Sequence, residues 1–547
     1  MATEILKAVK KQSPIEGNGL FAKEVIPAGK LIFSLPRPLL AAVDRTKLSH
    51  YCANCFTLAG DGSTGSQSLQ LKSCAGCRHV WYCGKSCQAA SWKREHKCQC
   101  GPMKAIPLGQ NLPHAARTVV QALCMRKAGK ISDEEWNAFH TLPSHEDSLR
   151  QQPDWETHAI MALGALHYSG TDDVFDTDEA IGVYCRVIAN SLTLTNPGLI
   201  PIGICLDPFA CSANHSCDPN TFVVFDGPQI FFRALKPIAK DEEILVSYID
   251  EANPFQYRQK ELLERYHFVC NCSKCQKGND AADERLPIPT PEQEQVMSKI
   301  AANLPKPAHS TSPLGLNLAA IEAHAFEVAE KEAGTPEADP RHATEGVVPA
   351  LQMLNSTGIW PSHRQPFPAL AEEFIRRESL FGPNRGNGYE YVPKSWLFQM
   401  HRYALIDSKL YPPHHPVHPM HIWSLVLPTM HIVKPDEFSA RQEIQDAVGA
   451  ELIKRLEPMH FLVDLINEME TSVKMSHGAD STYGQQILQR AMFTRSTFEG
   501  WMKDMAWYKK YDEAGLKKRK KAAEDIAREV EKKRGAWWDE MMKKGRV

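Results

Sequence analysis

The sequence has 547 residues, which predicts roughly three or four domains at 100–200 residues per domain. Apolar residues make up 43% of the chain and charged residues 23%, a composition that can bury a core and excludes a wholly disordered or fibrous protein. The formal net charge of −2 excludes binding to polyanions through the overall charge. No stretch approaches 18 consecutive apolar residues and the first residues lack a secretory pattern, so we expect no membrane span and no secretory signal.

The N-terminal residues show short strand patterns separated by turns. Apolar runs at 5–9 and 20–22 flank the turn Gly17-Asn18-Gly19, and another run covers 30–35 after a Pro-Ala-Gly turn. Alone, the Gly17-Asn18-Gly19 sequence is equally consistent with a plain hairpin turn and with a glycine loop that approaches a ligand.

Cysteines are concentrated between residues 52 and 100, which hold eight of the 16 in the chain. They form four ligand pairs, sufficient for two closed tetrahedral zinc sites: Cys52 and Cys55, Cys74 and Cys77, Cys83 and Cys87, and His96 and Cys100. Cys100 is preferred over Cys98 because a spacing of four residues places both ligands on one helix face. The spacing leaves open which pairs share a metal ion. Buried or disulfide-bonded cysteines are the less favoured alternative.

Beyond the cysteine-rich segment the pattern alternates between helix and strand. Apolar positions such as Val119, Leu123, Leu163 and Leu166 predict helices between 112 and 170. Apolar runs at 221–225 and 230–233 around an Asp-Gly-Pro-Gln turn predict a hairpin. The run 244–249 predicts a buried strand, and a helix is expected to start near Pro254.

Two later motifs carry chemistry only in combination. Residues 214–220 read Asn-His-Ser-Cys-Asp-Pro-Asn, which by itself is consistent with an ordinary loop stabilised by side-chain hydrogen bonds. The set Cys270, Cys272 and Cys275 supplies three thiolates, so a structural zinc would need a fourth ligand from elsewhere. Three unrelated thiols are the alternative. The unassigned candidates for the fourth ligand are Cys98, Cys124, Cys185, Cys205, Cys211 and Cys217.

The second half of the chain is less informative. Prolines among polar residues predict a linker or partly extended insert over 278–314, followed by a mainly helical part. Residues 508–547 contain 14 Lys and Arg residues against 8 Asp and Glu residues. The run Leu516–Lys521 is a candidate nuclear-import or nucleic-acid patch, but interleaved acidic residues make a solvated helix face the favoured interpretation.

In chain order, these motifs resemble the SET and MYND domain family of protein-lysine methyltransferases. The matching motifs are Glu16–Phe21, the cysteine-rich segment, Ser144–Glu146, Asn190-Ser191, Asn214–Cys217, Glu243–Tyr248 and the cysteine tail. The resemblance implies an α+β protein: a SET-type β-fold with an inserted MYND zinc finger and helical insert, a zinc-bound post-SET tail and a mainly α-helical C-terminal lobe. The implied parts are 1–51 (first part of SET), 52–100 (finger), 101–180 (helical insert), 181–250 (SET core), 251–277 (post-SET), 278–314 (linker) and 315–547 (helical lobe with basic tail).

The resemblance also implies an activity and a site. It implies methyl transfer from S-adenosylmethionine to lysine in a histone or non-histone protein, with three structural zinc ions. The finger would pair Cys52, Cys55, Cys83 and Cys87 on one zinc, and Cys74, Cys77, His96 and Cys100 on the other, while Cys217 would complete the tail site. The implied cofactor-binding residues are Glu16, Gly17, Asn18, His145, Asn190, Asn214, His215, Tyr248 and Phe268. Tyr248 is the expected catalytic residue, although without the resemblance a core tyrosine would be preferred.

A second function remains open, that of a non-catalytic adaptor or transcriptional regulator whose finger recruits proline-rich partners. We favour the enzyme, because a site that had lost its activity should lose Asn214, His215 or Tyr248 first, and all three are present. We expect a monomer in the cytoplasm, the nucleus or both, with no membrane partner and only weak support for nucleic-acid binding.

Overall fold

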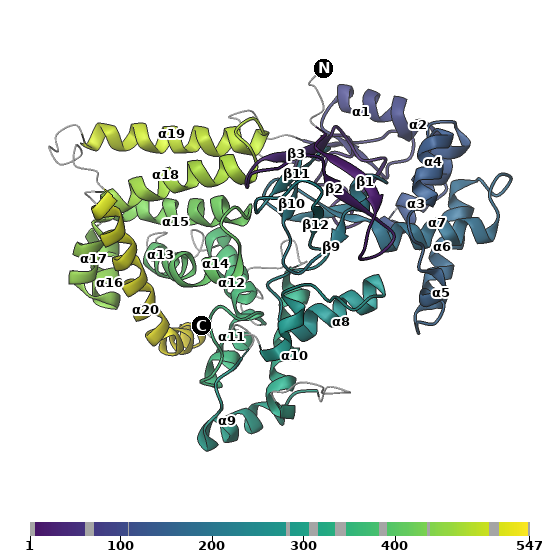
Figure 1. Cartoon of the computed structure of the whole chain (residues 1–547). Coiled ribbons are helices and arrows are strands. Elements are labelled where there is room, and N and C mark those ends of the chain that lie inside the picture. Colours follow the sequence, from purple (N-terminus) through teal and green to yellow (C-terminus); the bar gives the residue numbers. More distant parts are fainter. Residues whose placement is uncertain are drawn as a thin grey trace. The chain divides into compact units, whose positions relative to one another are not determined.

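The computed structural model describes residues 6–60, 70–107, 109–280, 285–305, 315–333, 346–381, 391–434, 438–502 and 513–544 (Figure 1). The chain divides into two compact units. The first comprises Met1–Ile249, Lys260–Cys272 and Lys474–Gln486, and the second comprises Asp250–Gln259, Ser273–Val473 and Ile487–Val547.

The first unit is built on small β-sheets. Its strands are β1 (Ala8–Gln12), β2 (Asn18–Ala22), β3 (Leu31–Leu35), β4 (Leu40–Val43), β5 (Lys72–Ser73), β6 (Trp81–Tyr82), β7 (Leu192–Thr195), β8 (Pro201–Leu206), β9 (Asn214–His215), β10 (Thr221–Asp226), β11 (Gln229–Ala234) and β12 (Glu243–Val246). The sheet orders are β1-β2-β12-β9, β10-β11-β3, β4-β8-β7 and β5-β6. Fully buried apolar side chains such as Leu20, Phe33, Phe232 and Ile244 form the core that these strands share.

Pairing between distant strands positions the motifs identified in the sequence. Strand β12 pairs antiparallel with β2, so that Ile244 faces Leu20, and parallel with β9, so that Val246 faces His215. The segments around residues 18–20, 214–215 and 243–246 therefore lie side by side in one sheet.

The strand predictions are accurate where the signal is local. The hairpin is confirmed, since β10 and β11 pair around the predicted turn with Phe225 opposite Ile230. The first strand starts at Ala8, later than expected, and residue 5 lies outside the described residues. The strand expected over 244–249 ends at Val246, because the backbone N–H of Tyr248 donates to the side chain of His215 instead of to a ladder partner.

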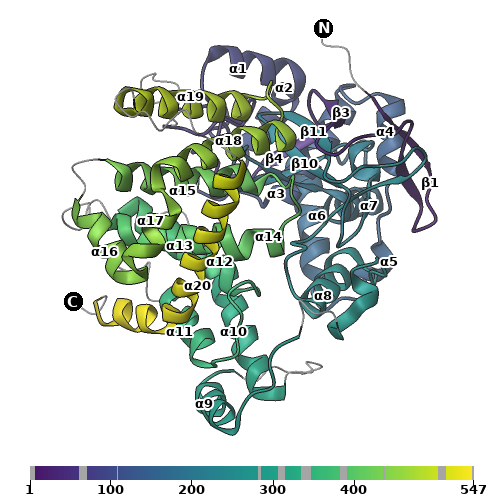
Figure 2. The same cartoon turned by 60° about the vertical axis from the view of Figure 1, so that its left-hand side comes forward.

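Helices form the rest of the first unit. They are α1 (Lys85–Ser91), η2 (Trp92–His96), α2 (Lys97–Lys104), α3 (His114–Lys127), α4 (Asp133–His140), α5 (Glu146–Leu149), α6 (Trp155–Ser169), α7 (Thr177–Asn190), η3 (Ala210–Ser212) and most of α8 (Phe255–Tyr266). Helices α3, α6 and α7 pack against one another (Figure 2). Val119, Leu123 and Leu166 lie in the core that these helices share. Leu163 does not join this core, because it lies on the outer face of α6 and is 41% exposed.

The second unit is helical. Its helices are η4 (Cys275–Asp280), α9 (Pro291–Ala301), α10 (Gly315–Ala333), α11 (Val347–Ser356), α12 (Phe367–Phe381), α13 (Tyr391–His401), η6 (Arg402–Ile406), α14 (Asp407–Leu410), α15 (Val417–Val433), α16 (Phe438–Val448), α17 (Ala450–Leu456), α18 (Pro458–Ser476), α19 (Thr482–Met502) and α20 (Glu513–Lys544). Helices α18 and α19 each have one end in the first unit.

One helix lies inside the proline-rich segment 278–314, which is therefore not extended throughout. Helix α9 begins with Pro291 in its first turn, where proline loses no hydrogen bond, and Thr290 and Gln293 form a capping box. The prolines that suggested a linker thus include one that starts a helix.

The basic run Leu516–Lys521 lies on α20, where most of its charges have acidic partners within the second unit. The guanidinium of Arg519 is 3% exposed and binds both carboxylate oxygens of Asp464, at 2.6 and 3.2 Å. Further ion pairs of the run include those of Lys518 with Glu457, Lys520 with Glu468 and Lys521 with Asp525. These pairs favour the helix-face interpretation over a free basic patch.

Among the described residues, none of the helices has both the length and the apolar character needed to span a bilayer.

Candidate active site and metal centres

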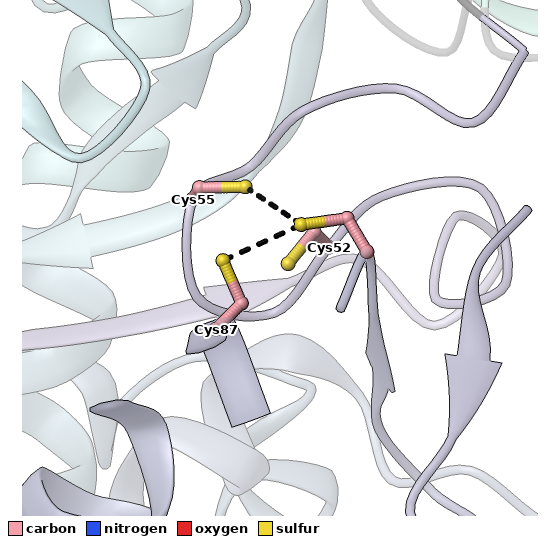
Figure 3. Close-up of side chains that lie close together, drawn as sticks. Cys52, Cys55 and Cys87 are labelled. Carbon is pink, nitrogen blue, oxygen red and sulfur yellow. Dashed lines mark hydrogen bonds between the residues drawn. The ribbon is translucent and has the colours of Figure 1, made fainter. Parts of the chain in front are cut away.

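The paired cysteines of residues 52–100 converge into two groups of four. The first contains Cys52, Cys55, Cys83 and Cys87, and the second contains Cys74, Cys77, His96 and Cys100; within each group the ligand atoms lie within 4.8 Å of one another. Figure 3 shows the sulfur atoms of Cys52, Cys55 and Cys87 pointing into one small space. The resemblance implies the same division of these eight ligands between two zinc ions.

The spacing of the ligand atoms fits tetrahedral zinc. A Zn–S bond of about 2.3 Å requires neighbouring sulfurs about 3.8 Å apart. The Sγ atoms of Cys55 and Cys83 are 3.7 Å apart, and those of Cys74 and Cys100 are 3.8 Å apart. The Nε2 atom of His96 lies 3.3 and 3.6 Å from the sulfurs of Cys74 and Cys77. The thiol of Cys98 instead donates to the carbonyl of Glu95, in agreement with the preference for Cys100.

A third group joins the loop after β9 to the cysteine tail. Cys217, Cys270, Cys272 and Cys275 offer sulfur atoms that all lie within 4.8 Å of one another, and the Sγ atoms of Cys217 and Cys270 are 4.0 Å apart. Of the six cysteines that the sequence left open as the fourth ligand, the structure places Cys217 in this group. A bound metal would link residues more than fifty positions apart.

The turn 13–18 is held against β9 by a side-chain amide. The backbone N–H of Ser13 donates to the carbonyl of Gly17, whose φ of +52° is readily adopted only by glycine. The Nδ2 atom of Asn214 lies 3.4 Å from the carbonyl oxygen of Glu16 and 3.3 Å from that of Asn18. Three of the predicted cofactor-binding residues, from two segments of the chain, therefore meet at this amide.

Aromatic rings gather beside this turn, at the end of β12. The ring of His215 lies 5.2 Å from that of Tyr248 and 5.8 Å from that of Phe268, measured between centroids. The Nδ1 atom of His215 accepts a hydrogen bond of 3.0 Å from the backbone of Tyr248, which fixes the direction of the histidine ring. His215, Tyr248 and Phe268 thus form one cluster, although they come from three separate segments.

The hydroxyl of Tyr248 has a fixed role as a donor. It donates to the carbonyl of Ala213 at 2.7 Å, so its lone pairs remain available to accept a contact. Burial, followed by the nearby Cys211, raises the pKa of Tyr248 well above its usual range. The phenol therefore keeps its proton at neutral pH.

Two further predicted cofactor-binding residues, His145 and Asn190, are connected to this cluster through neighbouring residues. His145 has a left-handed backbone (φ +48°), and its ring lies 5.4 Å from that of His267, the residue before Phe268. Asn190 ends helix α7 and donates to the carbonyl of Pro143 at 2.8 Å. Its amide holds the segment that precedes His145, which is an indirect position for a cofactor-binding residue.

Two aromatic residues of this cluster were missed as site residues in the sequence. The hydroxyl of Tyr266 donates to the carbonyl of Tyr248 at 3.1 Å, and their rings are 5.0 Å apart. His267 has a left-handed backbone (φ +63°), and burial and the neighbouring His145 lower its pKa. The available signal was the run Tyr-His-Phe directly before the cysteine tail.

Comparison with known proteins agrees with this geometry. Residues 17–249 match the SET domain family. The chain is 29% identical over 267 residues to SET domain and MYND-type zinc finger protein 6 of Schizosaccharomyces pombe, covering 49% of this chain and 51% of that protein. It is 29% identical over 289 residues to human histone-lysine N-methyltransferase SMYD3 (51% of this chain, 64% of that protein) and over 266 residues to human N-lysine methyltransferase SMYD2 (48% and 59%).

The matches thus cover about half of the chain and between 51% and 64% of these relatives. Residues 17–249 thus match the SET domain family, and over about half of its length the chain is similar to a SET domain and MYND-type zinc finger protein.

Proposed function

We propose that the protein transfers a methyl group from S-adenosylmethionine to the side-chain amine of lysine in a protein substrate. The observation that carries the proposal is the cluster of His215, Tyr248 and Phe268 beside the turn that Asn214 holds. The pairing of β12 with β2 and β9 brings the turn, His215 and the segment that leads to Tyr248 together, and Phe268 joins them from the segment before the cysteine tail. Relatives named as lysine methyltransferases support the same reaction.

The site offers the contacts that such a cofactor needs. Glu16, Gly17 and Asn18 present backbone groups at the turn, and Asn214 and His215 border it. The rings of Phe268 and His145 are the candidates for contact with the adenosine part, and Asn190 would act by holding the segment before His145. When bound, S-adenosylmethionine would supply an electrophilic methyl group on a positively charged sulfur.

The residues of the chain would then orient the acceptor and exclude water. A free lysine amine has a pKa of about 10.4, so it must lose its proton before it can attack. Aromatic and buried surroundings beside a positive sulfur disfavour a second positive charge and assist that loss. Because the hydroxyl hydrogen of Tyr248 points at Ala213, its oxygen can accept from the amine or from the C–H groups of the methyl. Alignment in a dry site supplies most of the rate in such a transfer.

We also propose three structural Zn²⁺ ions at the three cysteine groups. The buried cluster of the cysteine-rich segment contains few apolar side chains apart from its own cysteines, so metal binding would supply much of its folding free energy. The tail ion would hold Cys270 and Cys272 next to Cys217, and with them Phe268 close to His215.

One observation favours the second function, recruitment of a partner by the cysteine-rich segment. Trp92, on η2, is 42% exposed although it packs against His96 at 5.8 Å between centroids. An exposed tryptophan over a rigid metal site is a suitable platform for a proline-rich peptide. This activity is compatible with catalysis and would deliver substrates to it.

Two measurements test the proposal. Calorimetry of the zinc-loaded protein should show S-adenosylmethionine binding in the absence of any substrate. Incubation of cell extract with the protein and isotopically labelled cofactor, followed by mass spectrometry, should give labelled lysines and would identify the substrate and the number of methyl groups. A zinc-loaded protein that does not bind the cofactor would refute the enzyme and leave the adaptor.

A further inference from the structure

The carboxylate of Glu243, at the start of β12, links two parts of the candidate cofactor site. One oxygen accepts from the Nδ2 atom of Asn214 at 2.8 Å, and the other accepts from the hydroxyl of Ser13 at 3.0 Å. Ser13 opens the turn whose last carbonyls, those of Glu16 and Asn18, face the same Asn214 amide. Glu243 is therefore bonded to the start of the turn and to the amide that holds its end.

Of the three acceptors around the Asn214 amide, Glu243 is the closest. The two backbone carbonyls lie 3.3 and 3.4 Å away, near the limit of a hydrogen bond, whereas the carboxylate lies at 2.8 Å. A charged acceptor also forms the stronger bond. The position of the Asn214 side chain thus depends mainly on Glu243.

The second glycine of the turn gives independent support. A Cβ atom on Gly19 would lie 2.1 Å from Oε1 of Glu243 and 3.1 Å from Cβ of Ser13. Gly17 is required for its positive φ, but Gly19 has no such constraint and is needed for space. The glycine leaves room for the carboxylate between the turn and β9.

The backbone that carries Glu243 is also fixed. The amide of Asn220, which is 7% exposed, donates to the carbonyl of Glu243 at 2.8 Å and accepts from the N–H of Leu245 at 2.9 Å. The Asn220 side chain thus makes the hydrogen bonds to the backbone of β12 that a neighbouring strand would make. The carboxylate therefore starts from a rigid position.

We propose that Glu243 is a positioning residue for the methyl donor, which holds the turn 13–18 and Asn214 in the geometry that receives it. The proposal rests on the proposed function. Its consequence is that losing the carboxylate should weaken cofactor binding much more than it slows transfer at saturating cofactor, because Glu243 acts through Asn214 and the turn and not on the reacting atoms.

The test compares Glu243→Ala with Glu243→Gln and with a control variant. A bond to a charged acceptor changes an equilibrium constant by about 10- to 100-fold, so Glu243→Ala should raise the Kd for S-adenosylmethionine and its KM by that factor, with kcat changed less than about threefold. Glu243→Gln keeps an acceptor for Asn214 and should recover most of the affinity. Glu24→Ala is the matched control, because that carboxylate is 58% exposed and pairs with Lys7, which has no part in the Glu243 network.

Gly19→Ala gives a second variant, which removes none of the side chains of the network. Its methyl group would displace the carboxylate, so its cofactor affinity should fall as in Glu243→Ala. Melting temperatures of all variants identify any that fail to fold, and those are replaced by Ser13→Ala, which removes one of the two bonds and should give a smaller loss.

Hydrogen exchange without cofactor separates this proposal from the proposed function. Amides of residues 13–19 should exchange faster in Glu243→Ala than in the wild type, and at the wild-type rate in Glu24→Ala. A wild-type Kd together with wild-type exchange in Glu243→Ala would overturn the positioning role. If the wild type itself binds no S-adenosylmethionine, the proposed function fails and with it the role toward the donor, even where the exchange data show that Glu243 orders the turn.

Discussion

Replacing Tyr248 by phenylalanine removes one oxygen from the centre of the proposed site. The hydroxyl donates to the carbonyl of Ala213 at 2.7 Å, and this bond is lost in the variant. A neutral hydrogen bond contributes about 1 kcal/mol to stability. The ring remains and keeps its contacts with His215 and Tyr266, so no cavity of side-chain size is created.

The expected effects on stability and on activity differ widely. A loss of about 1 kcal/mol lowers the melting temperature of a domain of 150–250 residues by about 2–4 °C. Methyl transfer depends on alignment, and misplacement of the acceptor by an ångström costs about 100-fold, so we expect a loss of at least that size in kcat. Labelled methyl transfer at saturating cofactor and a melting curve measure the two quantities.

A distant tyrosine provides the control. Tyr184 in α7 is also buried, and its hydroxyl lies 3.4 Å from Nδ1 of His158, outside the proposed site. Tyr184→Phe should lower the melting temperature by a similar amount and leave transfer unchanged. Equal activity in Tyr248→Phe and wild type would refute the role of the hydroxyl. Equal losses of activity in both variants would show that the effect is one of stability.

Three further predictions concern metal, the basic run and pH. Metal analysis should give about three zinc ions per chain, and Cys217→Ser should remove one of them; two in the wild type would contradict the tail site. Arg519→Met leaves Asp464 buried without its partner and should lower the unfolding free energy by about 3–5 kcal/mol in urea titrations, whereas a loss below about 1 kcal/mol would show that the pair is not formed. Burial raises the pKa of Glu251 to about 7, so ionisation of this carboxyl group destabilises the folded state as the pH rises. The unfolding free energy of Glu251→Gln should therefore exceed that of the wild type by about 2–3 kcal/mol at pH 8 and by little near pH 5. A difference that does not depend on pH would contradict this prediction.

The ligand pairs of the two metal groups within residues 52–100 were accessible from the sequence because the two members of each pair are close in the chain. His96 and Cys100 lie at helical spacing on η2 and α2, whereas Cys87 lies on α1 and Cys83 precedes that helix, so the four-residue spacing identifies both pairs but predicts a shared helix only for the first. Their division into two groups was not accessible from spacing and followed from the resemblance, since the pairing crosses other ligands. The hairpin β10–β11 was predicted for the same local reason, through its turn.

What could not be predicted depends on contacts between distant segments. Glu243 was part of a recognised motif, but its bonds to Ser13 and Asn214 exist only because β12 lies between β2 and β9. The burial of Arg519 likewise depends on its ion pair with Asp464, 55 positions earlier in the chain. The basic run therefore lies on a helix face on which most charges are paired with acidic side chains. Patterns in a single sequence carry no record of such pairings.

The central sheet also has a consequence for how the protein is made. Strand β2 finds its partner β12 only after about 220 further residues have been synthesised, and at about 5–20 residues per second this takes roughly 10–40 s. During that time β1 and β2 can form only a two-stranded ribbon, which is marginally stable in water. A topology with such high contact order folds slowly, so the nascent chain exposes an unpaired edge on the ribosome and becomes a candidate client for chaperones.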